Sequence, residues 1–218
     1  MFPLSIDNYF ELAAFIISVL TYPRLKGTAY RLFPLFLFFV MGVELFGRYI
    51  RVVLRQHNLW LYNISTTVEF IFYAYIFSLH LQNPSNKRLA HGFMIFYPIL
   101  VLMNICFIQG FFNWNSYTMT LGSVFLVIFC CLFFYELLLN PVEEELRKDP
   151  MFWIATGILF FYLGDLSFNL FYNLLDAYAS TTAKKLFLNI NNNLTLILYS
   201  CFIMAFLCKR NLRRSLSQ

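Results

Sequence analysis

The sequence contains little charge. Only 12% of its 218 residues are charged, 60% are hydrophobic, and the mean hydropathy is +0.66. A soluble domain carries about 25% charged and about 45–50% apolar residues. The chain therefore lacks the polar surface that a water-soluble domain needs, and we expect the lipid bilayer to be its main partner.

The sequence also lacks the patterns of common cofactor and metal sites. No lysine lies deep in the last apolar segment, which excludes retinal, and the topology derived below keeps His57, His80 and His91 from sharing one metal. The cysteines lie within or at the edge of apolar runs without metal-site or disulfide spacing, as expected for packing residues: Cys106, Cys130, Cys131, Cys201 and Cys208. We expect no cofactor and no metal.

Apolar segments of membrane-spanning length account for most of the chain. A transmembrane helix needs about 20 mainly apolar residues, and seven segments qualify: 6–22, 31–50, 60–81, 90–110, 116–139, 151–175 and 186–208. They are too long for barrel strands and lack strict alternation. Residues 83–87 predict a turn between two of the segments. The expected fold is all-α, with a single domain over 1–218 that forms one bundle of seven transmembrane helices.

The basic residues set the expected orientation. They form short runs between apolar segments, which argues against nucleic-acid binding and fits the positive-inside rule. A cytoplasmic C-terminus and an outside N-terminus place 11 of the 16 Lys and Arg inside: Arg24, Lys26, Arg31, Lys87, Arg88, Arg147, Lys148, Lys209, Arg210, Arg213 and Arg214. The other five lie at the outer side: Arg48, Arg51, Arg55, Lys184 and Lys185.

Polar side chains within these segments collect in the outer half of the membrane. Such residues are costly in a bilayer, so each is a candidate functional group. The predicted ligand-binding residues are Glu44, Arg48, Arg51, Asn63, Glu69, Asp165, Asn169, Asn189 and Asn192. The inner halves are nearly free of polar groups and rich in rings, which make up 21% of the chain. We expect an outward polar pocket above an aromatic plug.

Helical spacing places several of these residues on shared faces. Glu44, Arg48 and Arg51 are separated by four and three residues and line one stripe. They form either a structural ion pair between helices or a guanidinium fork for a carboxylate-bearing ligand. Asp165 and Asn169 belong to a similar stripe, which either lines a cavity or holds neighbouring helices together.

Two stretches resemble known membrane proteins. They are residues 60–73, which read WLYNISTTVEFIFY, and the asparagine-rich start of the last segment near 189–193. This pattern resembles small bacterial seven-helix membrane proteins of unassigned function, and is similar to seven-helix sensor regions fused to histidine kinases. The resemblance implies a multi-pass protein of the bacterial cytoplasmic membrane and carries no agreed activity.

Three functions follow as hypotheses. The first is a receptor-like sensor that binds a small ligand and signals through a separate cytoplasmic partner, docked on the 140–150 loop or the basic C-terminus. The second is a solute transporter, proton-coupled carrier or oligomeric channel, in which Glu69 and Asp165 carry a proton. The third is a lipid enzyme that uses Asp165 and Glu69 in acid–base chemistry. A homo-oligomer is compatible with all three.

Overall fold

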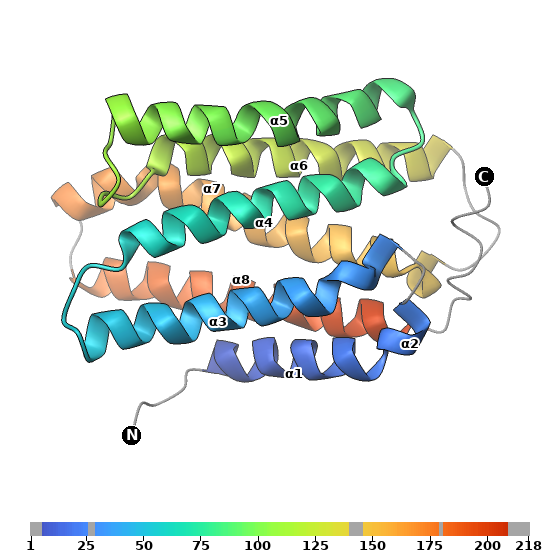
Figure 1. Ribbon diagram of the computed structural model, residues 1–218, viewed down its shortest axis with the longest axis horizontal. Coiled ribbons are helices and arrows are strands. Elements are labelled where there is room, and N and C mark those ends of the chain that lie inside the picture. Colours follow the sequence, from blue (N-terminus) through green and yellow to red (C-terminus); the bar gives the residue numbers. More distant parts are fainter. Residues whose placement is uncertain (1–5, 26–28, 140–145, 179–180, 209–218) are drawn as a thin grey trace.

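The computed structural model describes residues 6–25, 29–139, 146–178 and 181–208, and only the backbone for 24, 168–178, 181–188 and 191. Every regular element in these ranges is helical, which confirms the predicted all-α class (Figure 1). The elements are α1 (Ile6–Leu20), α2 (Tyr22–Leu25), η1 (Ala29–Leu32), α3 (Phe33–Val52), α4 (Leu59–His80), α5 (Pro84–Phe107), α6 (Ser116–Leu139), η2 (Leu146–Lys148), α7 (Pro150–Tyr178) and α8 (Thr181–Leu207).

The start of α5 differs from the sequence expectation. Helix α6 coincides with the expected range, but α5 begins at Pro84, six residues before the expected start at 90. Asn83 caps it, because its side-chain oxygen accepts a hydrogen bond from the Ser85 amide at 2.9 Å, and a proline suits the first helical turn. The predicted turn over 83–87 is therefore the cap and first turn of a helix.

Four helical segments in the described part of the chain are long and apolar enough to cross a membrane: Ala29–Val52, Pro84–Phe107, Ser116–Leu139 and Pro150–Ser167. Helix α4 does not meet this measure, because its amide and acidic side chains lower its hydropathy, although its 22 residues are long enough to span. Within α8, the fully described stretch Asn192–Leu207 is apolar but shorter than a span.

The seven long helices lie side by side along the long axis of the molecule (Figure 1). Helix α1 packs between α3 and α8, and α8 packs on α7, which in turn contacts α6. Helix α4 joins α3 to α6, and α5 covers α4 and α6 from outside this ring. The connections between α3 and α4 and between α5 and α6 lie at one end, where α7 also ends and α8 begins (Figure 1). We call it the polar end.

Aromatic side chains fill the interior of the bundle at the level where helices from its opposite sides come into contact. Phe33 packs edge-on against Phe72 and Phe202 with centroid distances of 5.0 and 5.6 Å, and Phe36 stacks on Phe72 at 3.9 Å. Tyr73 contacts Phe36 at 5.3 Å and Phe202 at 6.3 Å. These five residues form what we call the aromatic layer, which closes the bundle between its two ends.

A buried carboxylate ties three helices together at the opposite end. Glu136 of α6 accepts hydrogen bonds from the Gln82 and Asn83 amides and, at 2.6 Å, from the Asn86 side chain. These donors belong to the α4–α5 connection and to the first turn of α5. A charged acceptor at a helix N-terminus also interacts favourably with the helix dipole. Glu136 therefore has a structural role.

We predict that Gly122→Ala destabilises the protein by about 1–3 kcal/mol. A Cβ at Gly122 of α6 would lie 2.5 Å from the ring of Phe70, which is fully buried and has no room to move. Chemical unfolding in detergent measures the change. The matched control is Gly42→Ala on α3, where a Cβ meets nothing within 4 Å, and a gain of about 0.5–1 kcal/mol is expected. Equal stabilities of the two variants would contradict the packing of Phe70 on α6.

Candidate functional site

Four acidic side chains from four helices interact near the polar end. They are Glu11 of α1, Glu44 of α3, Glu69 of α4 and Asp165 of α7, and we call them the acidic cluster. Glu11 interacts electrostatically with both Glu44 and Glu69, and Glu69 interacts with Glu44 and Asp165. Helices α1 and α4 run away from the polar end, while α3 and α7 run toward it. Glu11 early in α1 and Glu69 midway along α4 therefore reach the level of Glu44 and Asp165, which lie past the midpoints of α3 and α7.

Arg48 links the acidic cluster to the N-terminal helix. Its guanidinium donates a hydrogen bond of 2.6 Å to the Asn8 side-chain oxygen of α1, and it attracts Glu44 one turn earlier on α3. The Tyr62 hydroxyl of α4 also hydrogen-bonds Glu44. Arg51 is exposed and acts on Tyr62 from the rim. Four carboxylates therefore face two guanidinium groups, one of which lies at the surface.

Glu11 is the most enclosed member of the cluster. Its side chain is 3% exposed, and its Oε1 atom has no hydrogen-bond partner among the residues that the structure describes. A buried carboxylate oxygen without a partner costs free energy, which a bound donor would recover. Glu11 was absent from the predicted ligand-binding residues, although its position one helical turn after Asn8 is a signal that could have identified it.

Two hydroxyl groups hold the remaining carboxylates. Ser65 donates to Glu69 Oε1 at 3.0 Å, within α4, and Ser123 of α6 donates to Asp165 Oδ2 at 2.8 Å. The Asp165 contact joins α6 to α7. The structure therefore brings Glu44, Glu69 and Asp165 together, in agreement with their predicted common location, and orients two of them from neighbouring side chains.

Three tyrosines form the floor beneath the carboxylates. Tyr73, Tyr162 and Tyr199 come from α4, α7 and α8, and each is less than one-tenth exposed. All three interact electrostatically with Glu69, and Tyr73 and Tyr199 also interact with Glu11. Their rings continue into the aromatic layer through the contact of Tyr199 with Phe202 at 6.0 Å. Tyr199 lies in an apolar run, so the sequence pattern alone did not single it out.

A cavity of about 460 Å³ opens at the polar end between α1 and α8. Its lining residues are Ile6, Asp7, Asn189, Asn192, Asn193 and Leu196. Asp7 interacts electrostatically with Glu11 and Glu44, so the cavity adjoins the acidic cluster. The predicted residues Asn189 and Asn192 are exposed and line this cavity. They lie apart from the acidic cluster, and Asp7 connects the cavity to it.

Asn63 has a different environment from the other predicted residues. It is 2% exposed, and its amide donates to the carbonyls of Phe111 at 3.3 Å and Asn113 at 2.7 Å. Its side-chain oxygen accepts from the Asn115 amide at 3.3 Å. These contacts hold the α5–α6 connection on α4, so the structure places Asn63 as a loop anchor.

Some predicted positions lie outside the described residues. They are the Asn169 side chain, residues 140–145 of the predicted docking loop and the basic C-terminus from 209 onward. Within the described ranges no group of three or more His, Cys, Asp or Glu side chains is arranged to hold a metal ion.

Comparisons of the chain with protein-family models, with curated proteins and with solved structures give no match. The site is therefore interpreted from its own geometry. Its features are four clustered carboxylates, an unpartnered oxygen on Glu11, a polar cavity beside them and a closed aromatic layer beneath.

We predict that Asn63→Ala destabilises the protein by about 1–3 kcal/mol, because three backbone groups of the α5–α6 connection lose their partner, and one of them, the Asn115 amide, is buried. Hydrogen exchange of residues 108–115 should accelerate, as measured by mass spectrometry in detergent. The neighbouring Ile64→Ala, at a residue that is 44% exposed, is the control and should leave this exchange unchanged. An unchanged exchange rate in Asn63→Ala would contradict the anchoring role.

Proposed function

We propose that all seven long helices cross a bacterial cytoplasmic membrane, with the N-terminus outside and the C-terminus inside. Helix α1 continues through Thr21 into α2, because backbone hydrogen bonds join Thr21 to Ile17 and Leu25 to Thr21. Together they cover 20 residues, or about 30 Å, the thickness of the hydrocarbon core. Helices α4 and α8, with 22 and 27 residues, are also long enough to cross it.

The distribution of basic residues supports this orientation. At the end opposite the acidic cluster lie Arg31, Lys87, Arg88, Arg147 and Lys148. With the residues counted in the sequence, 11 of the 16 Lys and Arg are then cytoplasmic. The positive-inside rule places such an excess in the cytoplasm, so the acidic cluster and its cavity open outward.

We further propose a receptor-like module that binds a small cationic solute through the acidic cluster. The carrying observation is the buried, unpartnered Oε1 of Glu11 beside Glu44 and Glu69. Carboxylates outnumber guanidinium groups there, and Arg48 is already engaged with Asn8, so an ammonium group suits the site better than a carboxylate. A charge-assisted hydrogen bond to Glu11 would satisfy the free oxygen.

The aromatic layer favours binding and signalling over transport. A solute that reaches the carboxylates meets Tyr73 and Tyr199 and then closely packed rings, so the site has access from one side only. A sensor needs only this one opening, whereas a carrier must open on both sides in turn. The ligand state would pass to a separate cytoplasmic partner through the helices that meet at the layer.

The test is ligand-induced thermal stabilisation of the protein in nanodiscs. Spermidine, choline and tryptamine serve as ammonium probes, with succinate as the anionic control. We expect at least one ammonium probe to raise Tm by several degrees, because a ligand that binds only the folded state stabilises it. Glu11→Gln should weaken its apparent affinity by about 10–100-fold, the value of one charged hydrogen bond.

The matched control is Glu136→Gln, the same change at a buried carboxylate of the opposite end. It should lower Tm without ligand and leave the ligand-induced shift intact. A shift by succinate alone would contradict the proposed charge of the ligand. An unchanged affinity in Glu11→Gln would contradict the proposed site.

Proteoliposomes separate the sensor from the carrier. We predict that the wild-type protein carries no uptake of the stabilising ammonium probe and no proton flux, because the aromatic layer is closed. Flux would be followed with radiolabelled probe and with an internal pH dye. Robust flux that Glu69→Gln abolishes would replace the sensor with a proton-coupled carrier that uses the same cluster.

A further inference from the structure

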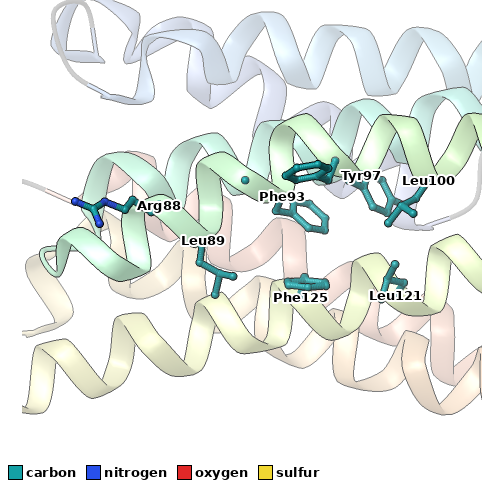
Figure 2. Close-up of a pocket in the computed structure, with 9 residues that line it drawn as sticks. Arg88, Leu89, Phe93, Tyr97, Leu100, Leu121 and Phe125 are labelled. Carbon is teal, nitrogen blue, oxygen red and sulfur yellow. The ribbon is translucent and has the colours of Figure 1, made fainter.

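A second cavity lies on the outer surface of the bundle. It is a groove of about 320 Å³ between α5 and α6 (Figure 2). Seven residues of α5 between Arg88 and Leu100 line it, together with Leu121 and Phe125 of α6. Both helices are apolar and long enough to cross a membrane, so the groove would open to lipid along its length.

The groove includes one position of α5, Gly92, that has no side chain. A Cβ at Gly92 would meet no atom within 4 Å. Phe93 and Tyr97 stack on each other at 4.8 Å and turn inward, where Phe93 contacts Phe125 at 5.0 Å. Figure 2 shows Leu121 and Phe125 of α6 pointing into the space that remains.

The groove has the dimensions of one lipid leaflet. From Arg88 to Leu100, α5 rises about 18 Å, at about 1.5 Å per residue. Half of the hydrocarbon core of a bilayer is about 15 Å. An acyl chain lying along Gly92 and Phe96 would therefore reach from the membrane surface to its middle.

Charge marks one end of the groove. Arg88 is exposed and is the only charged residue among its lining, and its side chain extends past the end of the groove in Figure 2. A guanidinium group matches a phosphate through paired hydrogen bonds and reaches the headgroup level from an apolar helix face. We propose that the α5–α6 groove binds an anionic phospholipid of the leaflet at the Arg88 end, with its phosphate on Arg88 and one acyl chain along Gly92.

The experiment uses the full chain in nanodiscs of equal parts phosphatidylglycerol and phosphatidylcholine, followed by native mass spectrometry of retained lipid. The wild-type protein should keep phosphatidylglycerol. Gly92→Leu fills the groove and should reduce retention about tenfold or more, while Gly42→Leu, also at an open helical glycine, should not. Arg88→Gln should lose the preference for the anionic lipid, and Arg147→Gln at the same end should keep it.

A photoreactive phosphatidylglycerol with a diazirine on its acyl chain gives an independent readout on the wild-type protein. Cross-links should map to residues 89–100 of α5 and 121–125 of α6. This result does not depend on the folding of any variant. Equal retention in Gly92→Leu and wild type, equal losses in Arg88→Gln and Arg147→Gln, or cross-links elsewhere would each overturn the proposal. So would a wild-type dimer that Gly92→Leu dissociates, since a second copy would then occupy the groove.

Discussion

The ring contacts of Tyr73 connect most of the bundle. From its place on α4, this side chain packs against Phe36 of α3, Tyr162 of α7 and Phe202 of α8, at centroid distances of 5.3, 6.1 and 6.3 Å. It is 2% exposed. Aromatic pairs at such distances stabilise packing beyond the area they bury. These contacts determine how closely the helices approach one another, and with that the depth in the bundle at which the acidic cluster lies.

The carboxylates of the acidic cluster, which lie on the polar-end side of the aromatic layer, cost the fold free energy. A charged side chain in a bilayer or a protein interior needs a partner. Ser65, Ser123 and Tyr62 each supply one hydrogen bond to the cluster, and Arg48 supplies charge. Among the described residues, Oε1 of Glu11 has no hydrogen-bond partner, which costs free energy. This cost is the physical reason for the proposed role of the cluster in ligand recognition.

Helix periodicity allowed much of the architecture to be predicted from the sequence. The range of α6 and the gathering of Glu44, Glu69 and Asp165 follow from apolar length and from spacings of three and four. The start of α5 did not, because Asn83 and Pro84 are equally common in turns and at helix N-termini. The aromatic plug stays a prediction, and the aromatic layer combines rings of α3, α4 and α8.

The roles of individual side chains were harder to predict from the sequence than the depth at which those side chains lie in the bundle. Asn63 and Glu69 share one helix face in the sequence, yet Asn63 bonds the carbonyls of a loop about 50 residues away, which no local pattern reveals. Glu11 and Tyr199 gain their importance only from neighbours on other helices. Spacing within a helix reports which face a residue occupies, and the partner across that face comes from tertiary packing.

The hydrogen bonds of Asn63 and Glu136 have a mechanical consequence. One fastens the α5–α6 connection to α4 at the polar end, and the other fastens the α4–α5 connection to α6 at the opposite end. Helices α4, α5 and α6 are thus held together at both ends and form one fixed group. Helix α1 packs mainly on α3 and α8, and Arg48 of α3 donates a hydrogen bond to Asn8 near its start. A displacement of α1 at Glu11 would therefore be transmitted along the helix to α2, at the end of the bundle opposite the acidic cluster.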